Sequence, residues 1–276
     1  MTIAQENFAF VADLVRTKSA ILLAPGKEYL VESRLAPIAR AQGKTVDAYV
    51  SEKRTSLSPL DAEVIVEALT TNETSWFRDA QPFMALTEHI IPELKAQKPV
   101  FSNLKIWSAA CSTGQEPYSI AMTLKDLFED PGSTSKPIIE ILATDLSNEV
   151  LQRAQTGRYS QLEVNRGLPA SHLVRHFVRA GTEWELDQSI RRMVRFSKHN
   201  LLDMPPIGGP FDIVFIRNVL IYFDVPTKRA VLSRIRSVLR PGGFLILGAA
   251  ETTVGIDDTW RRVQVGRSSV YQNAGS

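Results

Sequence analysis

Cysteine is nearly absent from this sequence: Cys111 is the only one among 276 residues. A single cysteine excludes an internal disulfide and any metal site built from several thiolates, and it agrees with a reducing compartment. No run of eighteen apolar residues is present, and residues 1–8 lack the charged and apolar regions of a signal peptide. We therefore expect a cytoplasmic protein that does not insert into a membrane.

Several ligand-binding motifs are also missing. The chain has neither a G-x-x-x-x-G-K-[ST] phosphate loop nor a G-x-G-x-x-G dinucleotide fingerprint. Its four histidines are His89, His172, His176 and His199. None of them stands in an H-E-x-x-H motif, so we expect surface or core residues and no metal site. The net charge of +2 and the lack of a strong basic stripe do not indicate nucleic-acid binding.

Two runs of residues do carry chemistry. The first, from Ile106 to Tyr118, reads I-W-S-A-A-C-S-T-G-Q-E-P-Y and passes from strand residues through a turn of small side chains into a helix. Small side chains let the backbone approach a ligand closely, and helix N–H groups point toward it. The second, Ile138 to Asp145, is a buried-strand pattern ending in the carboxylate that doubly wound folds use for a ribose diol. Together they predict a nucleoside site.

The composition of the turn indicates which nucleoside. Ala110 and Ser112 stand where a dinucleotide fingerprint has glycines, and a pyrophosphate needs that close approach more than a nucleoside does. S-adenosylmethionine therefore fits better than NAD. The alternative is a tight turn without a ligand, in which Asp145 is a helix cap. Cys111 has no histidine near it in sequence, which favours a small packing residue over a nucleophile.

The spacing of apolar residues divides the chain into two regions. Residues 1–70 show helical spacing, whereas strands and helices alternate from about residue 100, which predicts a mostly parallel sheet covered by helices. The expected helices in the first region are Phe8–Val15, Leu30–Arg40, Val46–Lys53 and Pro59–Leu69. The expected strands are Leu104–Ser108, Ile138–Thr144, Met193–Ser197, Phe211–Ile216, Phe244–Gly248 and Ser269–Gln272. The last strand has no convincing helix before it, so we expect it to be antiparallel.

These patterns give the expected domain organisation. A chain of this length, 44% hydrophobic, can bury a core in each of two domains. We place a helical N-terminal domain at 1–70, a linker that closes over the cofactor at 71–82, and an α/β domain at 83–276. Between Tyr159 and Arg192 the alternation breaks, which predicts a small β insertion at about 160–192.

Four blocks of sequence then point to a family: T-N-E-T-S-W-F-R at 71–78, A-C-S-T-G-Q-E-P-Y-S-I-A-M at 110–122, A-T-D-L-S at 143–147 and R-N-V-L-I-Y-F at 217–223. In these blocks the chain resembles the CheR-type chemotaxis receptor methyltransferases, over nearly its whole length. The resemblance implies a Rossmann-like methyltransferase domain with an antiparallel closing strand, preceded by a helical receptor-docking domain. It also implies methyl transfer from S-adenosyl-L-methionine to glutamates on the cytoplasmic helical bundle of chemoreceptors, giving glutamyl methyl esters and S-adenosyl-L-homocysteine.

The resemblance further implies roles for individual residues. Asp145 takes the ribose hydroxyls, and Glu116 lies near the methionine ammonium or its waters. Arg78 belongs to the segment that closes over the cofactor, and Tyr222 lies beside the transferred methyl. Our own hypothesis is that Arg78 orients a carboxylate of substrate or cofactor, so these two are the expected catalytic residues. The remaining expected cofactor contacts, which Arg78 also joins, are Asn72, Thr74, Asn200, Leu201, Arg217 and Asn218.

Each of these roles has a structural alternative. The alternatives are a helix cap for Asn72 and Thr74, a favourable position in the helix dipole for Glu116, a solvated pair of Arg78 with Asp79, and core packing for Tyr222. For the whole chain, two other functions are open. One is methylation of another substrate, although R-N-V-L-I-Y-F lacks the [ND]-P-P-[YF] loop of enzymes that methylate bases. The other is a non-catalytic regulator that binds S-adenosylmethionine.

The residues themselves give little indication of how the substrate is recognised. Residues 1–72 hold eight Lys plus Arg against nine Asp plus Glu, so charge alone predicts a solvated face, and receptor docking rests on the resemblance. Some family members grip a tethering peptide of the receptor with a glycine-rich hairpin in the β insertion. The corresponding stretch here, Arg179 to Ile190, has only Gly181. We therefore expect methylation that does not depend on such a peptide.

Overall fold

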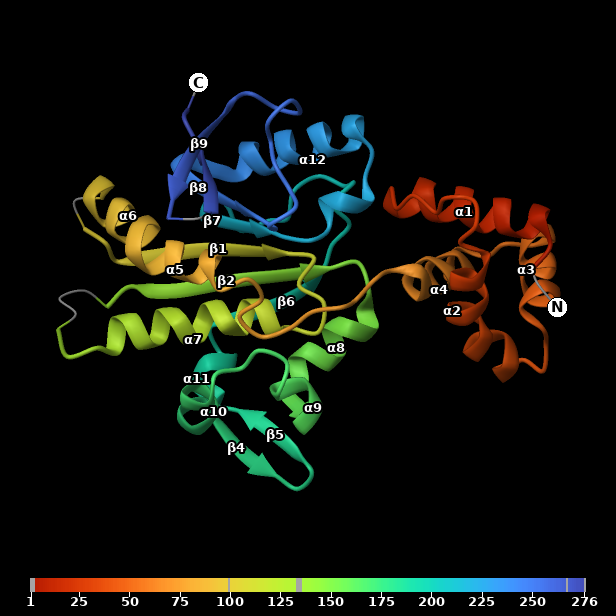
Figure 1. Ribbon diagram of the computed structural model, residues 1–276, viewed down its shortest axis with the longest axis horizontal. Helices are drawn as coiled ribbons and strands as arrows, with labels where there is room; N and C mark the ends of the chain where they lie inside the picture. Colours follow the sequence, from red (N-terminus) through yellow and green to blue (C-terminus); the bar gives the residue numbers. More distant parts are fainter. Residues whose placement is uncertain (1–2, 99, 133–135, 267, 276) are drawn as a thin grey trace. The chain divides into compact units, whose positions relative to one another are not determined.

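The computed structural model describes residues 3–98, 100–132, 136–266 and 268–275 (Figure 1). The chain divides into two compact units, one of residues 1–71 with 222–227 and one of residues 72–221 with 228–276. Each unit is described by itself. Within the described ranges, no helix combines the length and apolar character needed to cross a membrane.

The first unit is helical. Its helices are α1 (Gln5–Ser19), α2 (Glu28–Ala41), α3 (Val46–Thr55) and α4 (Pro59–Leu69), which confirms the four predicted helices. Polar caps start two of them, because Thr45 accepts a hydrogen bond from the N–H of Ala48 and Ser58 accepts one from that of Asp61. The helices share a core of fully buried side chains: Val11, Val15, Val31, Leu35, Val50 and Ile65.

The second unit contains a seven-stranded sheet in the order β6-β2-β1-β7-β8-β10-β9. The strands are β1 (Asn103–Ala109), β2 (Ile138–Asp145), β6 (Val194–Lys198), β7 (Phe211–Ile216), β8 (Leu239–Leu247), β9 (Trp260–Val265) and β10 (Ser268–Asn273). Neighbours from β6 to β8 are parallel, while β10 is antiparallel to both β8 and β9. The six predicted strands and the antiparallel closing strand are confirmed.

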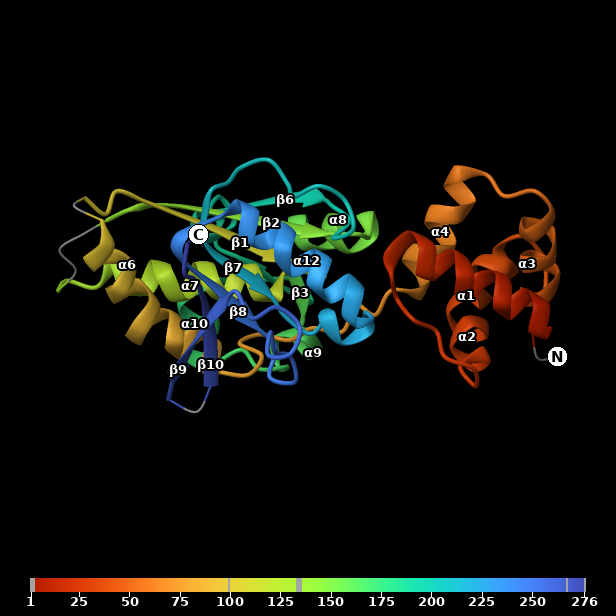
Figure 2. The same cartoon turned by 90° about the horizontal axis from the view of Figure 1, so that it is seen from above.

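The sequence analysis missed two parts of this unit. Strand β9, beside β10 in Figure 2, is an edge strand, W-R-R-V-Q-V, too polar to give a strand pattern. Residues 81–97 form α5 (Gln81–Ala85), a π-helical turn η1 (Leu86–Ile90) and α6 (Ile91–Gln97). Pro82 and Pro92 stand in the first turns of α5 and α6, where proline is tolerated although it reads as a helix breaker in sequence.

The helices that connect the strands cover the sheet. The larger ones are α7 (Gln115–Glu129), α8 (Asn148–Thr156) and α12 (Val225–Val238), and a 3-10 turn, η2 (Leu220–Tyr222), precedes α12. Helix α7 packs against β2 and β6, and α6 packs against β8. The core between sheet and helices includes Ile106, Ile120, Ile213 and Phe244, all fully buried. The expected α/β architecture is therefore confirmed.

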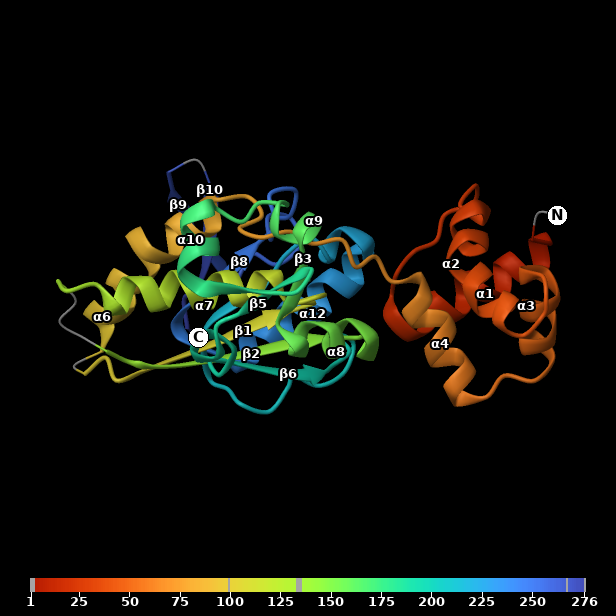
Figure 3. The same cartoon turned by 90° about the horizontal axis from the view of Figure 1, so that it is seen from below.

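The predicted β insertion is present as a separate three-stranded antiparallel sheet in the order β3-β5-β4. It consists of β3 (Arg158–Ser160), α9 (Gln161–Val164), α10 (Ala170–His176), β4 (Phe177–Ala180), β5 (Glu183–Leu186) and α11 (Gln188–Arg191). Strands β4 and β5 are joined by a two-residue turn with Gly181 at φ 64°. Figures 1 and 3 both show α10 beside α7, so the insertion packs on a helix that also covers the main sheet.

Two isoleucines on strands of the main sheet test this packing. Ile213 is fully buried in β7, and Ile138 at the start of β2 is 70% exposed. We expect Ile213→Ala to lower the free energy of unfolding by about 2–5 kcal/mol, because it leaves a cavity in the core. Ile138→Ala, the control, should cost less than about 1 kcal/mol. Urea unfolding followed by circular dichroism measures both, and equal losses would contradict the assigned burial.

Candidate active site

The strand order places a switch point between β1 and β7. The chain runs from β1 outward through β2 to β6, and then returns to start β7 and β8 on the other side. In open α/β sheets, ligands bind beyond the carboxyl ends of the strands at such a point. The residues there are the turn 110–114 after β1, Asp145 at the end of β2 and Arg217 after β7. Sequence positions more than one hundred residues apart are thereby brought to one edge of the sheet.

The backbone at this edge is strained. Ala110 and Ser112 have φ angles of 57° and 50°, in the left-handed region that costs a non-glycine residue roughly 1–3 kcal/mol. Gly114 has φ 93°, and a Cβ there would lie 2.9 Å from the Cβ of Ala154. Five of the six described non-glycine residues with positive φ lie in the segments around the switch point: Phe77, Asp79, Ala110, Ser112 and Asn218. Such clustering is typical of functional sites.

Asp145 is held at the turn by backbone donors. Its Oδ2 accepts a hydrogen bond from the N–H of Ser112 at 2.8 Å, and its Oδ1 accepts one from the N–H of Ser147 at 3.0 Å. The carboxylate is buried, with 7% of the residue exposed. The N-cap of α8 is Ser147, whose Oγ accepts from the N–H of Val150. The alternative that Asp145 is the helix cap is therefore wrong.

Arg217 connects three segments of this edge. Its side chain is 1% exposed, and its Nη1 donates to Glu116 Oε2 at 3.0 Å. Its Nη2 donates to the carbonyl of Arg78 at 2.7 Å and to Asp79 Oδ2 at 3.0 Å. Glu116 Oε1 also accepts a hydrogen bond from the Oγ of Ser108 at 2.8 Å. Arg217 thus fixes Glu116 and the 78–79 segment, and Asp79 pairs with it rather than with Arg78.

Residues 72–78 lie against the turn and form neither helix nor strand. The Oγ of Ser112 donates to the carbonyl of Asn72 at 2.7 Å, and the N–H of Phe77 donates to the Oγ of Ser119 at 3.1 Å. Trp76 is buried against Tyr159 of the insertion, with ring centroids 4.8 Å apart. No helix begins between residues 70 and 80. The alternative that Asn72 and Thr74 cap a helix is therefore wrong.

The remaining predicted residues lie in two places. Asn200 and Leu201 follow β6, where the preceding N–H of His199 donates to the carbonyl of Asp145 at 2.9 Å, so this loop runs beside the end of β2. Asn200 Oδ1 accepts a hydrogen bond from the N–H of Leu202. Tyr222 belongs to the first unit, where its carbonyl accepts a hydrogen bond from the N–H of Leu22 at 3.3 Å.

These groups suit a nucleoside that carries hydroxyls and positive charge. The turn 110–114 has no lysine to pair with phosphates, and it is accompanied by two fixed carboxylates, that of Asp145, which accepts from the N–H of Ser112, and that of Glu116, which pairs with Arg217. Carboxylates accept hydrogen bonds from hydroxyl and ammonium groups and repel phosphates. Residues 72–268 match the family described as CheR methyltransferase, SAM binding domain.

The chain belongs to the CheR methyltransferase family. It is 43% identical over 254 residues to "Chemotaxis protein methyltransferase Cher2" of Pseudomonas putida, covering 91% of this chain and 92% of that one. It is 40% identical over 275 residues to "Chemotaxis protein methyltransferase 1" of Pseudomonas aeruginosa, covering 99% of each. A Vibrio anguillarum "Chemotaxis protein methyltransferase" is 38% identical over 99% of this chain and 98% of its own length. The predicted family and the cofactor S-adenosylmethionine are confirmed.

One further residue at this edge of the CheR domain, Glu251, was not predicted from the sequence. Its Oε2 accepts hydrogen bonds from the N–H groups of Gly248 at 2.7 Å and Asn218 at 2.8 Å, and its Oε1 accepts from those of Val219 at 3.0 Å and Ile221 at 3.3 Å. One carboxylate therefore orders the segment after β7. No sequence signal marks Glu251, because its donors lie up to 33 residues away.

The prediction for Cys111 is confirmed. The residue is 1% exposed, and burial raises the pKa of its thiol well above the ordinary value. A protonated thiol is a poor nucleophile. Its backbone N–H donates to the carbonyl of Thr144 at 2.9 Å, so Cys111 serves the packing of the turn on β2.

Glu251→Gln tests the role of this carboxylate. The amide nitrogen of glutamine cannot accept hydrogen bonds, so two of the four N–H donors lose their partner. We expect the free energy of unfolding to fall by about 1–3 kcal/mol and the affinity for S-adenosylmethionine to fall with it. Urea unfolding and calorimetric titration measure the two effects. Glu149→Gln, an exposed change in the first turn of α8, is the control, and a matching small effect in both variants would argue against the role.

Proposed function

We propose that this chain transfers the methyl group of S-adenosylmethionine to glutamate side chains in the cytoplasmic domains of chemoreceptors, forming glutamyl methyl esters for chemotactic adaptation. The observation that carries the proposal is the likeness, over 91–99% of the chain, to relatives named chemotaxis protein methyltransferases. The proposed substrate places the activity in the cytoplasm. The helical bundle of the receptor is the proposed partner.

Methyl transfer to a carboxylate requires correct positioning of the reacting groups rather than a general base. When bound, S-adenosylmethionine supplies an electrophilic methyl group. A glutamate side chain has a reference pKa of about 4.3 and is already an anion at neutral pH, so no proton has to be removed. Correct orientation of reacting groups can contribute roughly 7–11 kcal/mol. The buried carboxylates and strained turn described above form a rigid frame of the kind that such orientation requires.

The proposed binding roles follow the positions of the side chains. Asp145 accepts hydrogen bonds from the ribose hydroxyls. Two backbone N–H donors hold its carboxylate in place for this role. Glu116 faces the ammonium group, and Arg217 holds Glu116 in place. The remaining residues proposed to line the cofactor are Asn72, Thr74, Arg78, Asn200, Leu201 and Asn218.

Arg78 and Arg217 are proposed to have different roles in the site. The guanidinium of Arg217 is buried and donates to Glu116, Asp79 and the carbonyl of Arg78. Among the described contacts, the guanidinium of Arg78 makes one hydrogen bond, to the carbonyl of Glu73 at 3.3 Å. Arg78 therefore retains donors for a carboxylate of substrate or cofactor, whereas Arg217 acts as a positioning residue. Tyr222 is proposed to donate or pack beside the transferred methyl.

The helical first unit is proposed to dock on the receptor, although it has no basic stripe. Three of its basic side chains are engaged in ion pairs: Lys44 with Glu52, Lys53 with Asp61 and Arg54 with Glu6. Residues 1–72 also hold nine Asp plus Glu against eight Lys plus Arg, so this region has no excess of positive charge. Complementary shape and apolar contact are therefore proposed to contribute to docking alongside charge.

Methyl transfer to receptor-containing membranes tests the proposal. With radiolabelled S-adenosylmethionine, we expect label on the receptor that is removed by mild alkali, which hydrolyses carboxyl methyl esters. Arg78→Ala and Tyr222→Phe should each lower turnover at least about tenfold, because each removes a group at the reacting atoms. Arg262→Ala, an exposed change on β9, is the control.

The other outcomes separate the alternatives. Alkali-stable label would indicate methylation of an amine or nucleic acid, and no label despite cofactor binding would indicate a regulator. Turnover within about twofold of wild type in both Arg78→Ala and Tyr222→Phe would remove the proposed catalytic roles.

We also propose that receptor methylation does not depend on a tethering peptide. The β4–β5 hairpin closes with a two-residue turn, so it carries no glycine-rich extension to grip one. Deleting the C-terminal peptide of a receptor should leave its methylation rate unchanged. Isothermal titration with the free peptide provides the second measurement, and micromolar or tighter affinity would contradict the proposal.

A further inference from the structure

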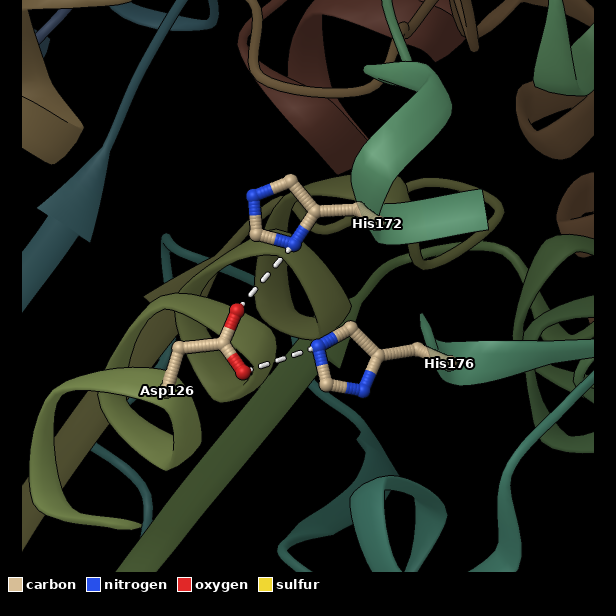
Figure 4. Close-up of side chains that lie close together, drawn as sticks. All are labelled: Asp126, His172 and His176. Carbon is tan, nitrogen blue, oxygen red and sulfur yellow. Dashed lines mark ion pairs between the residues drawn. The ribbon is translucent and has the colours of Figure 1, made fainter. Parts of the chain in front are cut away.

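Two histidines converge on one carboxylate between the insertion and the main sheet. His172 and His176 of α10 both face Asp126 of α7 (Figure 4). The Nδ1 of His172 lies 3.4 Å from Asp126 Oδ2, and the Nε2 of His176 lies 3.0 Å from Asp126 Oδ1. The sequence analysis treated these histidines as surface or core residues because no H-E-x-x-H motif is present. They are nevertheless four residues apart, as the histidines of that motif are, and so share one helix face.

The polar atoms of this cluster lack ordinary hydrogen bonds. The Nδ1 of His172, the Nε2 of His176 and Oδ1 of Asp126 are buried and make no hydrogen bond of acceptable geometry within the described residues. The side chain of His176 is only 3% exposed. Buried polar atoms are almost always satisfied, so three that face one another need a shared partner. A cation accepted by all three would satisfy them together.

The distances fit a small transition metal ion. Ligand bonds of about 2.0–2.2 Å in a tetrahedral zinc site put neighbouring ligand atoms roughly 3.3 Å apart. Both histidine–carboxylate distances are already close to this value, and one ligand atom from each of the three residues lies within 4.8 Å of the others. Two imidazoles with one carboxylate suit zinc, nickel or cobalt rather than magnesium or calcium.

We propose that Asp126, His172 and His176 form a binding site for one divalent transition metal ion of the zinc class. Three protein ligands leave a fourth position for water. Asp126 and His172 line an open surface cavity of about 590 Å³, which gives an ion a path from solvent.

The ion would clamp the insertion onto the main sheet. Its ligands come from α10 and from α7, which packs against β2 and β6. His172 also stacks on Phe77, with ring centroids 4.7 Å apart, and Phe77 precedes Arg78 in the segment across the turn. The site therefore adjoins the proposed active site without sharing a residue with it.

Arg175 is the one described cation that competes for this carboxylate. Its Nε lies 3.2 Å from Asp126 Oδ1, and its side chain is 55% exposed. An exposed arginine can move into solvent at little cost when an ion binds. Removing its charge should strengthen metal binding, which is the opposite of what loss of a purely structural contact would do.

Zinc titration of the full, untagged chain after removal of metals by a chelator tests the proposal. We expect one equivalent of Zn²⁺ to bind, and Co²⁺ in its place to show the visible absorption of a four-coordinate site. His172→Asn and Asp126→Asn should each weaken binding at least about tenfold, and Arg175→Gln should strengthen it. His89→Asn is the matched control, because His89 lies 3.2 Å from Glu93 but has no third ligand among the residues that the structure describes.

Either of two results would overturn the proposal: no stoichiometric Zn²⁺ binding up to millimolar concentrations, or affinity unchanged in both His172→Asn and Asp126→Asn. Circular dichroism checks that each variant folds. If His172→Asn does not fold, Asp126→Asn, which keeps the shape of the side chain, decides alone. None of these measurements depends on methyl transfer.

Discussion

The buried guanidinium of Arg217 is the interaction on which the candidate active site depends. It stands after β7 and holds Glu116 at the start of α7 together with the 78–79 segment. A buried arginine needs partners, since removing one member of such a pair costs about 3–5 kcal/mol. Two carboxylates and a carbonyl accept hydrogen bonds from its two Nη atoms, and they come from two segments that are distant in the chain. The same contacts that stabilise Arg217 therefore fix the geometry around the cofactor.

Backbone strain at the switch point likewise accompanies contacts between segments that are distant in the chain. The left-handed conformations of Ala110 and Ser112 place the N–H of Ser112 against Asp145 and its Oγ against the carbonyl of Asn72. The buried carboxyl ends of β1 and β2, which lie beside the turn, offset the cost of that conformation. Glu251 performs a comparable task on the other side of the switch point, where one carboxylate accepts four backbone N–H groups. A rigid edge of this kind suits a reaction that needs orientation more than proton transfer.

The insertion contacts both the segment across the turn and helix α7. Trp76 packs on Tyr159 and Phe177 of the insertion, and Gly167 lies so close to the carbonyl of Trp76 that a Cβ would be only 2.2 Å away. On another side, His172 and His176 meet Asp126 of α7. The segment across the turn is thus supported from both the main sheet and the insertion.

The sequence by itself determined the family, the cofactor, six of the seven strands of the main sheet and the four N-terminal helices, because local hydrophobic period and contiguous motifs encode them. It also placed Asp145 at the end of a strand and Glu116 in the first turn of a helix, as the structure has them. Only the tertiary structure decided that Arg217 is a buried bridge, that Glu251 orders the segment after β7, and that His172, His176 and Asp126 converge. Each of these depends on residues distant in the chain, and spacing along one sequence carries no information about which side chains the sheet and helices bring together.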